Sequence, residues 1–148
     1  VETHVRFGEK VHSPIVTPGE ADAVVGLEKL EALRFAHYLN IETGTVLVND
    51  HELVPGSVPN AESIYPRETI DFLKSKGMRV VALPASQTAR DLGDARMANV
   101  VMLGALSTLL PIEQEVWEKT LKLRIPAKYL DGNLKAFESG YDAMQKAI

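Results

Sequence analysis

The sequence predicts a three-layer α/β/α domain built on a mostly parallel β-sheet. Apolar residues recur with a period of two in some segments and with a helical period of about 3.6 in others. Strand-like and helix-like segments also follow one another in turn, which is the order of a parallel sheet covered by helices. The 148 residues, 45% of them hydrophobic, are enough for one domain with one core.

The N-terminal residues predict a hairpin at the edge of this sheet. Residues 1–7 alternate between apolar and polar side chains, and Gly8 and Glu9 supply a turn. Residues 10–13 continue as the second arm.

A strand and a helix follow the hairpin. Residues 21–25 form a short apolar strand that ends at Gly26, as a buried strand does. Leu27, Leu30 and Leu33 then recur at helical spacing with charged residues between them, which predicts an amphipathic helix.

The middle of the chain repeats this order. Residues 45–48 are β-branched and apolar, which favours a second strand. Residues 51–65 carry proline and glycine with little periodicity and are a candidate functional loop. A helix is expected at 66–76 and a third strand at 79–83, and Ser86 is expected to cap a short helix at 88–92.

The C-terminal part predicts three helices, at 95–110, 113–123 and 133–148. The first is apolar nearly all round. It must therefore be covered on most sides, either by its own domain or by another subunit.

Composition excludes several classes of protein. The net charge of −4 provides no basic field for a phosphate backbone, so we expect no nucleic-acid partner. The absence of cysteine excludes disulfides, thiolate catalysis and cysteine-held clusters from these residues. The longest uncharged run, 97–112, is shorter than the ~20 residues of a membrane span. We expect a cytoplasmic protein without membrane contact.

Catalytic and metal motifs are absent from the sequence. No G-x-G-x-x-G, phosphate-binding G-x-x-x-x-G-K-[ST], G-x-S-x-G or H-E-x-x-H occurs. His4 and His12 lie on the two arms of the expected hairpin, but no third ligand accompanies them. We therefore predict no catalytic residue and no metal site in this chain.

Three polar residues are candidates for binding an anion such as a phosphate of coenzyme A. Arg96 and Asn99 open the apolar helix, whose N-terminal amides attract negative charge. Asn49 follows a strand at the edge where open α/β sheets bind ligands. Each has a plainer interpretation: Arg96 neutralises Asp94, Asn99 bonds a neighbouring loop, and Asn49 shapes a turn.

Several segments together resemble the gamma domain of 2-oxoacid:ferredoxin oxidoreductases of the pyruvate and ketoisovalerate type. The likeness is greatest to the small (beta) subunit of the indolepyruvate enzymes and covers nearly all 148 residues as a single gamma-type domain, 1–148. The matching segments are VRFGEKVHSP at 5–14, GEAD at 19–22, GLEKLEAL at 26–33, GTVLVN at 44–49, RMANVVMLGA at 96–105 and NLKAFESG at 133–140.

This resemblance implies a Rossmann-like fold and a role as a subunit, not itself catalytic. The enzyme would decarboxylate an aryl 2-oxoacid on thiamine diphosphate, pass electrons through iron–sulfur clusters to ferredoxin, and form an acyl-CoA. The thiamine diphosphate and the clusters would lie on a large alpha subunit as partner. In the absence of the large subunit, we expect that the isolated chain can form a homodimer.

One departure from the family pattern affects the site. Members of the family open with a strand, a G-x-G-G-Q-G-like turn and a helix, and the 148 residues start at Val1, after the position of this β–α unit. We expect the domain 1–148 to be N-terminally incomplete, with the unit either absent or lying before these residues. A glycine-rich turn before a helix binds phosphate groups, so without it a coenzyme A site within residues 1–148 is in doubt. Two rival functions stay open: a free-standing ligand-binding domain of the same fold, and a dehydrogenase that uses a dinucleotide.

Overall fold

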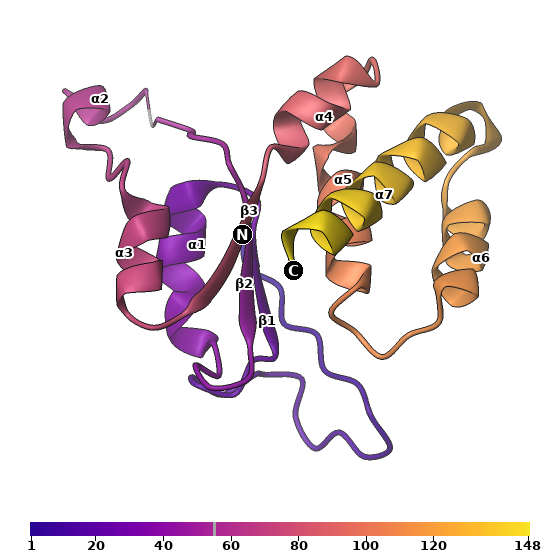
Figure 1. Cartoon of the computed structure of the whole chain (residues 1–148), viewed down its shortest axis with the longest axis horizontal. Helices are drawn as coiled ribbons and strands as arrows, with labels where there is room; N and C mark the ends of the chain where they lie inside the picture. Colours follow the sequence, from indigo (N-terminus) through magenta and orange to yellow (C-terminus); the bar gives the residue numbers. More distant parts are fainter. Residues whose placement is uncertain (55) are drawn as a thin grey trace.

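The computed structural model of the chain describes residues 1–54 and 56–148. Three parallel strands in the order β1-β2-β3 form a sheet with helices on both faces (Figure 1). This confirms the predicted α/β class and the parallel sheet. The strands are β1 (Ala23–Gly26), β2 (Thr45–Asn49) and β3 (Arg79–Leu83), and the helices are α1 (Lys29–Phe35), η1 (Ala36–Tyr38), α2 (Ala61–Ile64), α3 (Thr69–Ser75), α4 (Ala85–Asp91), η2 (Ala95–Met97), α5 (Ala98–Ser107), α6 (Gln114–Arg124) and α7 (Ala127–Ala147).

The central strand β2 sets the register of the sheet. Its five residues are all buried, which fits a strand paired on both sides and covered on both faces. Val46 pairs with Val80, and Leu47 pairs with Val81 on the same neighbour. Because side chains alternate along a strand, Val46 packs into one apolar cluster and Leu47 into the other.

The face covered by α1 and α3 is held by small and β-branched side chains. Val24, Val46 and Val48 pack there against Ala32 of α1 and Leu73 of α3. A Cβ added at Gly26 would lie 2.5 Å from the Cβ of Ala32, so glycine lets α1 begin close to the end of β1.

The other face is covered by α4, α5 and α7, and the contact between α5 and α7 has no spare room. A Cβ at Gly104 would overlap the carbonyl oxygen of Phe137, and a Cβ at Gly140 would overlap that of Val101. Val101, Met102 and Ala105 are thereby buried. The apolar helix expected at 95–110 is therefore covered by its own domain, which confirms that alternative.

The predicted edge hairpin is wrong. Residues 1–20 contain no strand, and the guanidinium Nη1 of Arg6 closes this segment by donating to the carbonyls of Ser13 and Ile15. Val5 and Phe7, which the hairpin interpretation makes apolar strand residues, are 73% and 55% exposed. An isolated two-stranded hairpin is marginal without a neighbouring strand or helix to cover it, so alternation alone was a weak signal.

The start of the last helix also differs from its prediction. α7 begins at Ala127, directly after Pro126, and Gly132 lies inside it. Gly132 faces Met97, whose sulfur would lie 3.3 Å from a Cβ added at this position. The buried residues of α7 form one stripe, consisting of Ala136, Phe137, Gly140 and Met144, and no helix in the described part of the chain is long and apolar enough to cross a membrane.

Candidate functional site

Three strand ends meet at one edge of the sheet and carry a cluster of polar contacts. β1 ends at Gly26, β2 at Asn49 and β3 at Leu83, and all three strands are parallel. We call the residues that follow them the carboxyl edge; these are the loop residues 27–28 and 50–54, together with residues 84–86, which comprise Pro84 and the start of α4. Ligands of open α/β sheets bind at this kind of edge.

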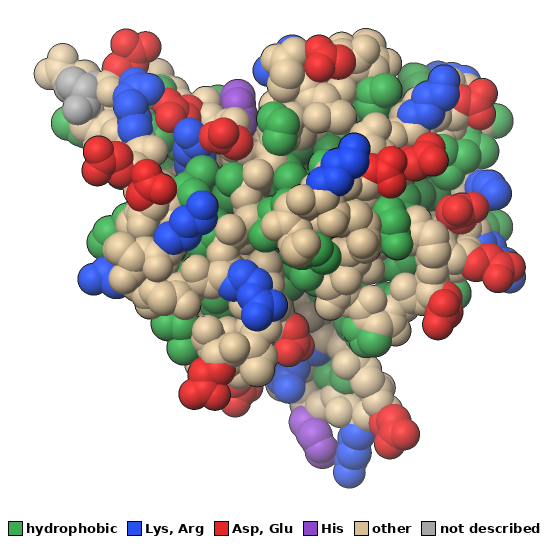
Figure 2. Space-filling model, viewed as in Figure 1, with side chains coloured by type: hydrophobic (Ala, Val, Ile, Leu, Met, Phe, Trp, Pro, Cys, Tyr) green, Lys and Arg blue, Asp and Glu red, His purple; other side chains and the backbone are tan. Residues whose placement is uncertain are grey.

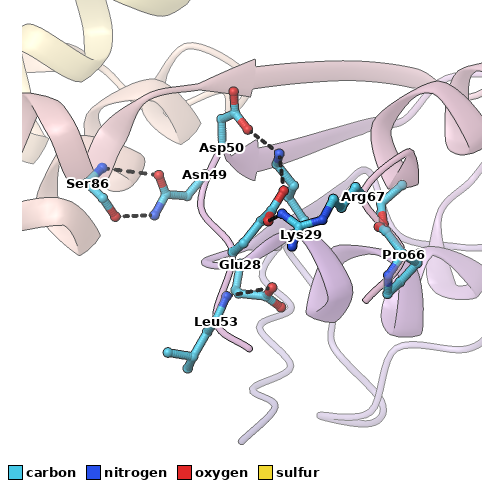
Figure 3. Close-up of polar contacts among 10 residues, drawn as sticks. Glu28, Lys29, Asn49, Asp50, Leu53, Pro66, Arg67 and Ser86 are labelled. Atoms are coloured by element: carbon cyan, nitrogen blue, oxygen red, sulfur yellow. Dashed lines mark hydrogen bonds and ion pairs between the residues drawn. The ribbon is translucent and has the colours of Figure 1, made fainter. Parts of the chain in front are cut away.

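Asn49 joins all three strand ends. Its side chain is buried, and Nδ2 donates to the carbonyl of Leu27 (3.1 Å) and to Oγ of Ser86 (2.8 Å). Oδ1 accepts from the backbone N–H of Ser86 (3.1 Å), as Figure 3 shows. Both amide N–H groups are therefore used to hold the loop after β1 and the start of α4 in place.

Glu28 fastens the loop after β2 to the start of α1. This buried carboxylate is the N-cap of α1 and accepts from the backbone N–H of Glu31 through Oε2 (3.0 Å). Its other oxygen, Oε1, accepts from the backbone N–H of Leu53 (3.2 Å). A single side chain thus satisfies a free amide of the helix end and one of a loop more than twenty residues away.

Charged side chains hold the same loop from outside. Nζ of Lys29 lies 2.8 Å from Asp50 and 3.2 Å from Glu52, and Nη1 of Arg67 lies 2.6 Å from the other oxygen of Glu52. The hydrogen bond to Asp50 raises the pKa of Lys29 above its usual value, burial opposes this, and Glu52 adds to the rise. Lys29 is therefore a cation at neutral pH, placed between two carboxylates (Figure 3).

Arg96 and Asn99 lie at the start of α5, apart from Asn49. Arg96 belongs to η2, and its Nε and Nη2 donate to the Asp94 carboxylate at 2.7 to 3.1 Å. These bonds lower the pKa of Asp94 to about 2. Asn99 is exposed on the first turn of α5. The predicted neutralisation of Asp94 by Arg96 is thus present.

Helix α4 separates the two parts of the predicted anion site. Ser86, the partner of Asn49, lies in the first turn of α4, whereas Asp94 follows its end. Seven helical residues span about 10 Å. In the described residues no hydrogen bond or ion pair joins Asn49 to Arg96 or Asn99. The carboxyl edge and the start of α5 are separate features.

Sequence reasoning missed the residues that tie the carboxyl edge together. It expected Ser86 to cap the short helix, but Pro84 precedes that helix as its N-cap and Ser86 accepts from Asn49 instead. Glu28, Lys29, Glu52 and Arg67 were read only as surface charges or loop residues. A carboxylate two residues after an apolar strand and directly before a helix, as Glu28 is, was the available signal for an N-cap.

Potential metal ligands do not gather in the described part of the chain. No group of three or more His, Asp or Glu side chains there could hold an ion. His4 and His12 line one shallow hollow of about 420 Å³ inside the N-terminal segment, but Nδ1 of His4 accepts from the backbone N–H of Val16 (3.0 Å).

Fold and edge together define a class: a parallel α/β domain whose strand ends are fixed by a buried asparagine and a buried N-cap glutamate. The sequence profile of the pyruvate ferredoxin/flavodoxin oxidoreductase family matches residues 1–143. The chain belongs to this family, as the resemblance of its segments predicted.

Named relatives agree with this assignment. The chain is 33% identical to the indolepyruvate oxidoreductase subunit IorB of Thermococcus kodakarensis, over all of this chain and 75% of the relative. It is 36% identical to the IorB subunit of Archaeoglobus fulgidus, over 96% of this chain and 72% of the relative. A solved structure, the gamma subunit of a keto/oxoacid ferredoxin oxidoreductase from Geobacter sulfurreducens, matches with a TM-score of 0.65 and 26% identity, over 90% of this chain and 69% of that one.

Proposed function

We propose that this chain is the small subunit of a 2-oxoacid:ferredoxin oxidoreductase of the indolepyruvate type. The observation that carries the proposal is the similarity to IorB subunits along almost the whole chain. The assembled enzyme would convert an aryl 2-oxoacid to an acyl-CoA and pass the electrons to ferredoxin.

The cofactors of that enzyme are assigned to a larger partner subunit. Iron–sulfur clusters are held by cysteine thiolates, and these 148 residues contain no cysteine. The clusters therefore belong on the alpha subunit in this proposal, and the family resemblance assigns thiamine diphosphate to the same subunit. The small subunit would support the active site of its partner and take no covalent part in the reaction.

A contact with coenzyme A at the start of α5 is part of the proposal. The side chain of Arg96 is 81% exposed, and Asp94 holds it in one orientation through Nε and Nη2. Nη1 then points its N–H groups away from that carboxylate, where a phosphate would accept them together with the amide of Asn99. The negative charge of Asp94 opposes the anion, so we expect a modest contribution. Asn49 would act from a distance by positioning α4.

Coexpression with the companion large subunit tests the main proposal. We expect the two chains to copurify, and reduction of an electron acceptor by indolepyruvate to require both. Phenylpyruvate should also be a substrate, and pyruvate should be a poor one. Failure to copurify, with no dependence of the activity on this chain, would favour a free-standing ligand-binding domain.

Arg96→Ala tests the coenzyme A contact. Loss of one exposed charge-assisted contact should raise the KM for coenzyme A about three- to tenfold and leave the KM for the oxoacid unchanged. Arg34→Ala is the matched control, because Arg34 is also exposed and also pairs with a carboxylate at 2.7 Å. An unchanged KM for coenzyme A would remove Arg96 from the site.

A further inference from the structure

Helix α6 packs on the rest of the chain by one side only. Leu121 is buried, and the ring of Trp117 lies 6.0 Å from that of Phe137 on α7. Figure 1 shows α6 at the outer margin of the molecule, beside α7. The side opposite this contact bears Val116 and Leu123, which are 52% and 76% exposed.

These two exposed side chains lie in one line along the helix. A helix turns about 100° per residue, so positions seven apart nearly coincide in direction and lie about 10 Å apart along the axis. Thr120 lies between them on the same side. We call Val116, Thr120 and Leu123 the outer face of α6.

Acidic residues precede basic ones along α6, with Glu118 and Lys119 in the middle and Lys122 paired with Glu118 at 3.8 Å. Glu113 and Glu115 lie at its start, and Lys122 and Arg124 at its end. Figure 2 shows apolar and both kinds of charged side chain along the edge of the molecule where α6 lies. The helix dipole favours such an order, but it does not account for a line of exposed apolar side chains between the charges. When two such helices lie antiparallel, the acidic start of each lies beside the basic end of the other.

We propose that the outer face of α6 binds a second copy of this chain, with the two α6 helices antiparallel about a two-fold axis. Val116 of each copy then packs against Leu123 of the other. Glu115 lies beside Lys122 of the second copy along one margin, and Glu113 lies beside Arg124 along the other. A two-fold axis makes every such contact twice.

Two features limit the strength of this dimer. A pair of eleven-residue helices buries less than the roughly 1,200 Å² of a standard interface, so the dissociation constant should lie in the range of tens of micromolar or above. Lys119 also lies near the two-fold axis, so the Lys119 side chains of the two copies face each other. This like-charge contact weakens the dimer. The proposal concerns the isolated chain and does not depend on the proposed function.

Analytical ultracentrifugation of the full chain tests the apolar part of the contact. From about 1 µM to about 1 mM the average mass should rise from monomer towards dimer. Leu123→Lys should raise the dissociation constant tenfold or more. Ile64→Lys is the matched control, because Ile64 is 67% exposed on α2, and it should have no effect. A monomer at every concentration, or association that Leu123→Lys leaves unchanged, would overturn the proposal.

A charge exchange tests the antiparallel arrangement. Glu115→Lys and Lys122→Glu should each weaken association, and the double variant should restore it. Residues 115 and 122 lie about 10 Å apart within one helix and do not pair there, whereas Lys122 pairs with Glu118 of its own helix at 3.8 Å. Each variant is therefore also measured with Glu118→Gln added, and restoration that persists in this background requires contact between copies. Lys119→Ala should strengthen association. A double variant as weak as the single ones would overturn the arrangement, and α6 variants that affect only copurification with the large subunit would assign this face to that partner.

Discussion

The contact between α5 and α7 and the carboxyl edge of the sheet are held by opposite means. The two helices approach so closely at Gly104 and Gly140 that neither position has room for a methyl group. The carboxyl edge is held by directed polar contacts from Asn49 and Glu28, in loops that carry exposed side chains such as Leu27 and Leu53.

This difference separates stability from adaptability. In close apolar packing, even one added atom is strongly destabilising, because the helices must move apart to make room for it. A polar network tolerates changes in its outer charges and responds mainly to the loss of its buried members. We therefore expect the helix contact to dominate stability and the carboxyl edge to determine the geometry of the loops.

The largest effect is expected at Gly140. Gly140→Ala forces a Cβ into the carbonyl of Val101 and should lower the free energy of unfolding by about 3 kcal/mol or prevent folding. Urea denaturation followed by circular dichroism measures this. Gly56→Ala is the control, since no atom lies within 4 Å of its added Cβ. Equal stability of the two variants would contradict the close contact.

Asn49 should give the next largest effect. Asn49→Ala leaves the backbone N–H of Ser86 and the carbonyl of Leu27 without their partner and should cost about 2 kcal/mol. Asn99→Ala, on an exposed helix turn, should change stability by less than about 0.5 kcal/mol. If both variants were equally stable, the carboxyl edge would not depend on this amide.

Variants of Glu28 separate the contribution of this side chain to the helix α1 from its contribution to the loop at Leu53. Glu28→Ala should cost about 1 kcal/mol through loss of the N-cap and should also increase hydrogen exchange at the amide of Leu53. Glu28→Gln keeps one acceptor oxygen and should protect one of the two amides. Unchanged exchange at Leu53 in Glu28→Ala would show that the loop is held by the outer ion pairs instead.

The smallest effect concerns the ion pair of Asp94 with Arg96. Because the folded pKa of Asp94 is about 2 against a usual 3.8, its contribution is fully present above about pH 4 and is lost as the pH falls towards 2. Stability measured between pH 5 and 2 should therefore decline less steeply in Asp94→Asn than in the original protein. Identical pH profiles would contradict the pair.

Prediction from sequence succeeded where a pattern repeats over a whole element. The β-branched, apolar residues 45–48 and the residues at 79–83 located two strands, and the first of them is buried at every position, as expected for a strand covered on both faces. The hairpin at residues 1–13 failed because its alternation is local, whereas a strand needs a neighbour that the local sequence does not specify.

The candidate site was predicted only in part. Asn49 was identified because it follows a strand, and the pairing of Arg96 with Asp94 because the two lie close in the sequence. The contacts of Glu28 with Leu53, and of Glu52 with Lys29 and Arg67, join residues far apart along the chain. Such contacts leave no periodic signal.

The sequence by itself determined the fold class, the family and the absence of cysteine ligands, because each depends on residue types and their order. Only the tertiary structure decided what covers the apolar helix α5 and which polar side chains meet at the carboxyl edge. Glycine within a helix either permits a close contact with a neighbouring helix or only lowers helix stability. Which of these holds for Gly104 and Gly140 depends on the position of the neighbouring backbone. That position follows from packing of the whole domain and not from the residues on either side.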